Sequence, residues 1–460
     1  MKKDRFYTVL LVISMALSLV CTYFISINTS TLPQFINSTI NKESSTETTE
    51  SENAKRTYFQ LSQPKYQDVF SPDKIVIKQN NVNYLVDYPD LVSNVIQRLA
   101  DRPFEIQDTQ VYKMDTHLRD ALLQDGIQLL FPEPVQLSTL GHFLIENDDV
   151  NEGMLIDTIF LISKDNSIAY LIDHTNNTYL KVNSHDSLSE DIWKMITSVK
   201  KSWRMVEEYE GKRQAIYLPV EAPKVSTQVY TLDSLPDSLF ISKIFPDSEF
   251  IIPKSENEGE LIYRTYRYML TINSLEQLLN LTIQSAQDEE APIVNDKLIS
   301  SFEPLKSYEY WNNGIKYFDK GEDYLIYRRY LNGYPIFSEP SLPEYGATKI
   351  YLRNHESSDV YRYQMPLLIL NVHIDDLSKS IKLESANDIL EQLAQHHIAL
   401  SDVSDIRIAY EWQKDMEDFK KVTFIPKWYI EVEGKYYRLE DLDNVSGSES
   451  MEEEAVSSGL

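Results

Sequence analysis

The hydrophobic pattern of this chain opens with one long apolar stretch near its start. Phe6 to Ile27 reads FYTVLLVISMALSLVCTYFISI and contains no charged residue. Such a stretch is long enough to cross the roughly 30 Å hydrocarbon core of a bilayer as a helix. Lys2, Lys3 and Arg5 precede it, and basic residues stay on the cytoplasmic side of a membrane. The pattern therefore predicts a single transmembrane helix, with residues 1–5 in the cytoplasm and the bulk of the chain extracellular.

Two other interpretations of this stretch fit less well. A cleaved signal peptide has a shorter apolar core that ends at small residues, whereas the segment from Thr22 to Ile27 is bulky. A lipoprotein would carry its lipid on Cys21, but Val20 stands where a small residue is expected. We therefore expect the helix to be retained as an anchor in the cell membrane.

A polar segment comes next, and helical spacing follows it. Residues 28–56 are rich in Ser, Thr, Asn and Glu, which predicts a flexible tether. From 57 to 205 the pattern predicts a helix-rich α+β domain. Its predicted elements are a helix on Leu91, Val92, Val95, Ile96 and Leu99, a helix capped by Asp115 and closed by Gly126, a hairpin over Asp157–Asp173, and a helix opened by a Ser187–Glu190 capping box and carrying Ile192, Trp193, Ile196, Val199 and Trp203.

From about Arg213 the pattern changes to strands. The predicted strand regions are Glu260–Ile272, Asp323–Phe337, Lys349–Arg353, Asp359–Val372 and a closing hairpin over Thr423–Leu442 that turns at Gly434. The predicted helices are Ser234–Ile244, Val294–Phe302 and one that begins at Ser385 with Asp388 in the box position. We expect two sheet-rich domains, 206–290 and 291–442, each an antiparallel sheet with packed helices, and a disordered acidic tail at 443–460.

Two short segments of these domains resemble each other. Leu261–Tyr266 reads LIYRTY and Leu325–Tyr330 reads LIYRRY. A duplicated α+β unit would produce this match, and so would the shared composition of two aromatic strands. Both interpretations remain open from the sequence.

Composition excludes several functional classes. The net charge is −27, which disfavours nucleic acid and anionic lipid surfaces as partners, because phosphate binding requires an excess of Lys and Arg. The single Cys lies in the apolar stretch, so the folded part holds no disulfide, thiolate metal ligand or thiol nucleophile. Only 12 Gly occur, and neither a GxGxxG nor a GxxxxGK[ST] phosphate loop is present.

No catalytic, cofactor or metal site is predicted from the polar residues. The eight His are His117, His142, His174, His185, His355, His373, His396 and His397, and none forms an HExxH pair. We interpret the adjacent His396 and His397 as polar surface near a helix end, the His373-x-Asp375-Asp376 group as a solvated strand end, and the Asp173-His174 pair as part of a turn. The Ser71–Lys74 segment, SPDK, lacks the apolar helix on which a Ser-x-x-Lys nucleophile stands. A glycosidase-type carboxylate pair is neither located nor ruled out by the 71 acidic residues.

The aromatic strands offer a second kind of site. An exposed face for peptide or glycan would use the tyrosines of these strands, namely Tyr263, Tyr266, Tyr268, Tyr327, Tyr330 and Tyr334. Because side chains alternate across a strand, about half of them belong to the core instead.

The apolar stretch carries a more specific pattern. Ser14, Ser18, Thr22 and Ser26 recur every four residues, which places them along one side of a helix. Small hydroxyl residues in a membrane let a second helix approach closely and can bond across the contact. The alternative is that each hydroxyl bonds a carbonyl of its own helix. We predict that these four residues contact a partner helix.

Two strand segments resemble a known family. YLNGYPIF, with its turn after Asn332, and FIPKWYIEVEGKYYRL, with Pro426 and Trp428, are similar to the YycH family of Gram-positive bacteria, as are the anchor and tether. The sheet units resemble those of the companion YycI and, more loosely, PepSY-type domains. The resemblance implies an accessory of the WalK sensor kinase in the WalK/WalR two-component system, acting through its membrane helix together with YycI. No catalytic residues are known in that family.

The leading hypothesis is therefore a non-enzymatic, membrane-anchored regulator of a WalK-like sensor histidine kinase that controls cell-wall metabolism, with a YycI-like protein as second partner. Two alternatives from other classes are a membrane-anchored cell-wall enzyme and a wall- or peptide-binding sensor. An enzyme requires a cleft in which titratable groups converge with shifted pKa values.

Overall fold

The computed structural model describes residues 64–443, except for gaps at 107–108, 147–152, 164–167, 186–187, 247–252, 256, 285–296, 354–359, 416–417 and 419. The predicted transmembrane helix at 6–27, the tether and all but the first residue of the predicted tail lie outside the described residues. Among the residues that are described, no helix combines the length and apolarity required to span a membrane.

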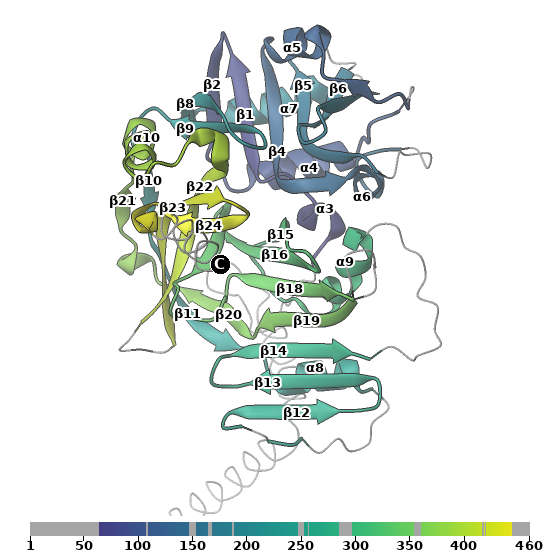
Figure 1. The fold of residues 1–460 in the computed structure, drawn as a ribbon, viewed down its shortest axis with the longest axis vertical. Helices are drawn as coiled ribbons and strands as arrows, with labels where there is room; N and C mark the ends of the chain where they lie inside the picture. The colour runs from purple at the N-terminus through teal and green to yellow at the C-terminus, as the bar shows by residue number, and fades with distance from the viewer. Residues whose placement is uncertain are drawn as a thin grey trace, which may run out of the picture. The chain divides into compact units, whose positions relative to one another are not determined.

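The first lobe, residues 64–219, is built on a nine-stranded antiparallel sheet (Figure 1). In spatial order its strands are β3 (Tyr112–Lys113), β7 (Thr178–Asn183), β6 (Ile168–Asp173), β5 (Leu155–Ile162), β4 (Gly126–Gln136), β1 (Lys74–Gln79), β2 (Val82–Val86), β8 (Trp203–Glu210) and β9 (Ala215–Pro219). The hairpin predicted over 157–173 is confirmed as β5 and β6, although its turn lies outside the described residues.

Five helices accompany this sheet in the described part of the chain: α3 (Tyr66–Val69), α4 (Leu91–Ala100), α5 (Thr116–Leu122), α6 (Leu137–Gly141) and α7 (Leu188–Ser198). Helix α4 confirms the predicted helix, with Leu91, Val95, Ile96 and Leu99 buried along one face. The Asp115 cap is also confirmed, because its carboxylate accepts from the backbone N–H of Leu118 at 3.0 Å.

Two predicted helix ends are wrong. Helix α5 ends at Leu122, and Gly126 instead begins β4, where an added Cβ would lie 2.5 Å from the Phe160 ring. Helix α7 ends at Ser198, and Trp203 begins β8. The indole N–H of Trp203 donates to the carbonyl of Ile196 at 3.2 Å, so the ring folds back on the helix that we expected to contain it.

The second lobe, residues 224–443, is built on a 13-stranded sheet among the described residues. Its strand order is β12 (Glu260–Arg264), β13 (Tyr268–Asn273), β14 (Leu278–Ile283), β19 (Val360–Pro366), β18 (Ala347–Leu352), β16 (Tyr324–Leu331), β17 (Tyr334–Ser338), β22 (Val403–Lys414), β23 (Lys421–Val432), β11 (Gln228–Ser234) and β20 (Leu368–His373), with β15 (Ile315–Lys320) on β16 and β24 (Lys435–Arg438) on β23. A separate pair is formed by β10 (Lys224–Ser226) and β21 (Ser380–Lys382).

Three helices of this lobe match predicted positions: α8 (Asp237–Ile244), α9 (Lys297–Tyr308) and α10 (Ala386–Gln395). The capping box of Ser385 and Asp388 is confirmed at the start of α10. The closing hairpin is confirmed too, with Gly434 at φ +73° between β23 and β24. Helix α9 continues past Pro304 to Tyr308, six residues beyond its predicted end.

Hydrogen bonding in the second lobe runs across the boundary predicted at 290/291. Strand β14 pairs with β19, and β11 pairs with both β20 and β23. The LIYRTY segment forms β12 at the end of the strand order, whereas LIYRRY forms β16, which pairs with β15, β17 and β18. The two similar segments thus occupy different positions in one sheet, and the domain boundaries themselves remain predictions.

Candidate functional site

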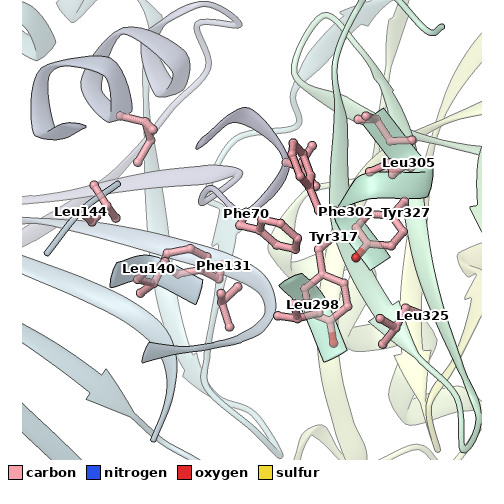
Figure 2. Close-up of a cluster of buried hydrophobic side chains, with 14 of the residues drawn as sticks. Phe70, Phe131, Leu140, Leu144, Leu298, Phe302, Leu305, Tyr317, Leu325 and Tyr327 are labelled. Atoms are coloured by element: carbon pink, nitrogen blue, oxygen red, sulfur yellow. The ribbon is translucent and has the colours of Figure 1, made fainter. Parts of the chain in front are cut away.

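The two lobes pack against each other along a surface that we call the seam, and one half of it is apolar. Phe70, which follows α3, is fully buried among second-lobe rings (Figure 2). Its ring centroid lies 6.0 Å from that of Phe302, 6.4 Å from Tyr317 and 6.2 Å from Tyr327. Tilted and edge-on aromatic contacts of this kind are favourable beyond their burial. The apolar half therefore joins the lobes into one hydrophobic core.

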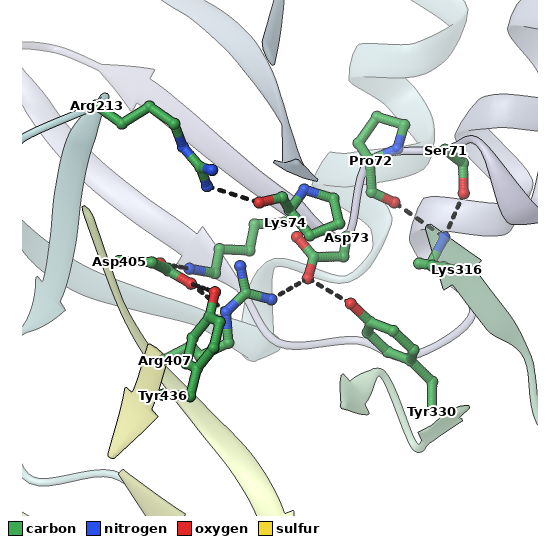
Figure 3. Close-up of polar contacts among 11 residues, drawn as sticks. Ser71, Pro72, Asp73, Lys74, Arg213, Lys316, Tyr330, Asp405, Arg407 and Tyr436 are labelled. Atoms are coloured by element: carbon green, nitrogen blue, oxygen red, sulfur yellow. Dashed lines mark hydrogen bonds and ion pairs between the residues drawn. The ribbon is translucent and has the colours of Figure 1, made fainter. Parts of the chain in front are cut away.

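The other half of the seam is a buried ion network of Asp73, Lys74, Asp405 and Arg407 (Figure 3). The Arg407 guanidinium binds Asp73 at 2.5 Å and also binds Asp405. The ammonium of Lys74 binds the other oxygen of Asp405 at 2.9 Å. Two first-lobe charges thus neutralise two second-lobe charges, and the network is balanced.

Electrostatics favours the charged forms of Asp405 and Arg407. Burial by itself raises the pKa of Asp405, but the positive charges of Arg407 and Lys74 hold this pKa well below its usual range. Burial lowers the pKa of Lys74, an effect that the Asp405 carboxylate opposes. Removing one partner of such a buried network leaves an uncompensated charge, which is costly. The network therefore fixes how the lobes are aligned.

Hydroxyl and ammonium groups extend the network. The Tyr330 hydroxyl donates to Asp73 at 2.8 Å, and the Tyr436 hydroxyl donates to Asp405 at 3.2 Å. Lys316 reaches from β15 to the Ser71 hydroxyl and to the Pro72 carbonyl at 3.0 Å (Figure 3). Burial lowers the pKa of Lys316 to about 8.

Beside the balanced network lies a group of carboxylates, the acid cluster, made of Glu133, Asp319 and Glu431. Arg213 binds Glu133, and Lys320 binds it at 3.1 Å. Burial raises the pKa of Glu431 to about 7; Arg213 opposes this shift, and the neighbouring carboxylates add to it. Burial likewise raises the pKa of Asp319 to about 6. Glu431 and Asp319 thus bind protons at higher pH in the folded chain than they would in an unfolded chain.

A cavity of about 90 Å³ lies in the seam between the balanced network and the turn at Asn332-Gly333. Tyr334 donates from this turn to Asp87 of the first lobe at 2.6 Å. Gly333 has φ +81°, and an added Cβ would lie 3.4 Å from the Cα of Pro89. One oxygen of Asp73 is buried at the cavity without a hydrogen-bond partner among the described residues. The space suits a few waters better than a drug-sized ligand.

The tyrosines proposed for an exposed face are mostly internal. Tyr263, Tyr327 and Tyr330 are buried, whereas Tyr266 is 79% exposed. Tyr330 and Tyr334 both serve the seam. These residues therefore do not form one exposed binding face.

Several histidines and the SPDK segment have protein partners that the sequence did not reveal. His174 binds the buried Asp157 at 2.6 Å, and His373 binds Asp375 at 2.6 Å. Burial is the largest single influence on the pKa of His174 and lowers it, but the hydrogen bond to Asp157 and the charges of Asp157 and Asp173 together raise it by more, so the net shift is upward. In the SPDK segment, Ser71 accepts from Lys316 while Lys74 binds Asp405, so the two residues serve the seam.

Sequence reasoning missed the seam, although one signal was present. Asp405 and Arg407 lie in the strand segment VSDIRIAY. The apolar residues around them in this segment are Val403, Ile406 and Ile408. Charged residues inside an apolar strand indicate either a solvated face or a buried pair. Their partners Asp73 and Lys74 lie more than 300 residues earlier, so no local pattern connects them. The predicted partner-helix residues Ser14, Ser18, Thr22 and Ser26 lie outside the described residues.

Comparison with known protein families identifies the chain. The YycH protein N-terminal domain matches residues 4–201, and the YycH protein C-terminal domain matches residues 213–443. The chain belongs to the YycH family. The two family domains meet near Arg213, between β8 and β9, and the seam contacts join residues of one domain to residues of the other.

One solved structure supports the YycH fold. The crystal structure of YycH from Bacillus subtilis matches with a TM-score of 0.62 at 14% identity, covering 82% of this chain and 98% of that one. An uncharacterized protein from Eubacterium rectale matches with a TM-score of 0.31 at 11% identity, covering 53% of this chain and 90% of that one. No curated protein sequence matches the chain.

Proposed function

We propose that this YycH-family chain is a non-enzymatic, membrane-anchored regulator of a WalK-type sensor histidine kinase. The observation that carries the proposal is the match of both YycH domains across nearly the whole chain. The resemblance implies a YycI-like companion as well, and the apolar stretch at 6–27 supports a location in the cell membrane with the lobes outside.

The chemistry of the seam supports a regulatory rather than a catalytic role. Functional clefts of enzymes present titratable groups with shifted pKa values to a substrate. In the described part of this chain, the charged groups of Asp405, Arg407 and Lys74 instead form ion pairs within the network. The cavity beside them has a volume of only about 90 Å³. These groups therefore hold the lobes together, and a rigid pair of lobes is what a regulator needs in order to present a fixed surface.

Regulation requires contact across or within the bilayer, because the lobes lie on the opposite side from the kinase's catalytic part. A helix that served only as an anchor could be apolar all round. The stripe of Ser14, Ser18, Thr22 and Ser26 instead suits close packing against another transmembrane helix. A difference in packing energy between two states of the kinase would shift its equilibrium.

The test replaces these four residues together with Leu in the full-length chain, which keeps the hydrophobic length. A matched control places Leu at Val12, Ala16, Val20 and Phe24, which lie on the opposite side of the helix and leave the stripe intact. Autophosphorylation of a co-reconstituted WalK-type kinase is measured with the YycI-like companion present. Membrane insertion is verified by carbonate extraction.

We expect the stripe variant to lose regulation and the control to retain it. Normal regulation by the stripe variant would refute a role for the helix and would move the contact to the lobes. Absence of any effect of the wild-type chain on the kinase would refute the proposed function as a whole.

A further inference from the structure

Three side chains with metal-ligand chemistry converge in the first lobe, and none of them belongs to the seam. Glu105 follows α4, Glu146 follows α6, and His185 follows β7. A carboxylate oxygen from each Glu and a ring nitrogen of His185 all lie within 4.8 Å of one another. Both Glu side chains are exposed and His185 is half-buried, so the group is open to solvent.

Backbone hydrogen bonds hold Glu105, Glu146 and the end of the strand that precedes His185. The N–H of Phe104 donates to the Leu144 carbonyl at 2.7 Å, and the N–H of Glu146 donates to the Phe104 carbonyl at 3.0 Å. Glu105 and Asn183 exchange two further bonds, at 3.0 and 2.9 Å. The side chains of Phe104 and Leu144 are buried in the core, and this burial holds the hydrogen-bonded backbone segments in place. Their geometry therefore does not depend on the metal.

The group lacks a protein counter-charge among the described residues. Neither Glu105, Glu146 nor His185 forms a side-chain hydrogen bond or ion pair with another described residue. Two carboxylates held this close repel each other. In the seam the buried acids Asp73 and Asp405 share Arg407, whereas no guanidinium or ammonium among the described residues binds the exposed Glu105 or Glu146. A bound cation would supply the missing positive charge.

We propose that Glu105, Glu146 and His185 bind a divalent transition-metal ion of the zinc type. The imidazole selects the class, because Zn²⁺ accepts nitrogen and carboxylate ligands whereas Ca²⁺ and Mg²⁺ prefer all-oxygen sites. Ligand atoms about 2.0–2.2 Å from a tetrahedral ion lie about 3.5 Å apart. Small rotations of the two exposed Glu side chains close that distance. Three protein ligands leave a fourth position for water or for a donor from another molecule.

This inference goes beyond the proposed function and does not depend on it. The metal ties together the segments after α4, α6 and β7, which are distant in sequence. No local pattern predicts the site, because its ligands do not share a helix or a short motif and the backbone bonds through Phe104, Glu105 and Asn183 join three separate segments.

The test uses the full-length chain in detergent, stripped of metal with a chelator. Zn²⁺ is titrated in competition with a chromophoric chelator, and the thermal midpoint is recorded with and without Zn²⁺. We expect one site whose affinity falls at least about tenfold in His185→Ala and in the charge-neutral double variant Glu105→Gln/Glu146→Gln, since each removes direct ligands.

Matched variants separate a site from surface binding. His117→Ala removes an exposed His on α5 that lies outside the group, and should leave zinc affinity unchanged. His185→Cys supplies a thiolate ligand and should restore binding. Zn²⁺ should raise the thermal midpoint of the wild-type chain and of His117→Ala, but not of His185→Ala. Zinc affinity within twofold of wild type in His185→Ala and in the double Gln variant would overturn the proposal, as would the absence of zinc binding by the wild-type chain.

Discussion

The apolar and charged halves of the seam join the same two lobes by different physics. Around Phe70 the contact is made by aromatic rings, whose attraction is non-directional apart from modest preferences of ring orientation. Around Arg407 it is made by ion pairs that require fixed positions for every partner. The apolar half therefore contributes attraction between the lobes, whereas the charged half determines their alignment. Misaligned lobes would leave buried charges without partners, at a cost in free energy.

The largest expected effect comes from breaking the charged half. Arg407→Ala removes the guanidinium that binds the buried carboxylates of Asp73 and Asp405, and should lower the free energy of unfolding by about 3–5 kcal/mol. This loss in the free energy of unfolding is measured by urea unfolding of the full-length chain. The control Lys194→Ala removes an exposed pair with Glu190 and should leave the midpoint unchanged. A loss no larger for Arg407→Ala than for the control would show that the network contributes no alignment.

The acid cluster should make the joined lobes more stable in mild acid. Glu431 has a folded-state pKa of about 7, above its ordinary value of 4.5, so it binds a proton more readily in the folded chain. This contribution is fully present below pH 4.5 and is lost as the pH rises through 7. The thermal midpoint should therefore rise when the pH falls from 8 to 5.5.

The variant Glu431→Gln should flatten that pH profile, because the amide carries no titrating proton. It should also raise stability at pH 8 by about 1–3 kcal/mol, which is the desolvation cost that the ionised carboxylate no longer imposes. Asp405 acts in the opposite sense, since its lowered pKa makes stability fall in strong acid, below its ordinary value near 3.8. An unchanged profile in Glu431→Gln would exclude the acid cluster as its origin.

The apolar half should tolerate a change of shape that the charged half would not. Phe70→Leu keeps an apolar side chain in the same space and should cost about 1.5 kcal/mol or less, because neighbouring rings can adjust. Chemical denaturation of this variant beside Arg407→Ala tests the comparison directly. A loss for Phe70→Leu as large as that for Arg407→Ala would mean that the aromatic rings also fix alignment.

The smallest effect is expected at the turn that borders the cavity. Tyr334→Phe removes the hydroxyl that donates to Asp87 but keeps the ring, and Arg204 remains to satisfy the carboxylate. We expect a loss of about 0.5–1.5 kcal/mol, measured in the same denaturation series. Tyr266→Phe is the control, since Tyr266 is exposed and outside the seam. Equal effects of the two variants would remove Tyr334 from the seam's energetics.

The elements that the sequence predicted well are those with complete local signals. Helix α4 has an apolar face of regular spacing, and α10 has both residues of its capping box. Strands β12 and β13 were less clear, because their turn contains no Gly or Pro. It is closed instead by the Thr265 hydroxyl, which accepts from the backbone N–H of Tyr268 at 3.1 Å. The pattern over 260–272 therefore gave one strand region where the structure has two strands.

Neither the strand order nor the sites could be predicted from the sequence, because both depend on contacts between distant segments. The balanced network joins residues 73 and 74 to residues 405 and 407, and the proposed metal ligands come from three separate segments. Local periodicity reports which face of an element is buried, but not which distant element covers it. Only the tertiary fold supplies those pairings.

The strand order of the second lobe determines when its sheet can form during synthesis of the chain. Strand β11, at 228–234, lies between β23 and β20, and both partners are made much later. Strand β17 is likewise synthesised well before its parallel neighbour β22. The first-lobe sheet, by contrast, is complete once residue 219 has emerged. A nascent chain that stops before residue 403 thus exposes unpaired strand edges, which favour aggregation and proteolysis. Strand β23, made after β11 and β22, is the strand that joins these two in the sheet.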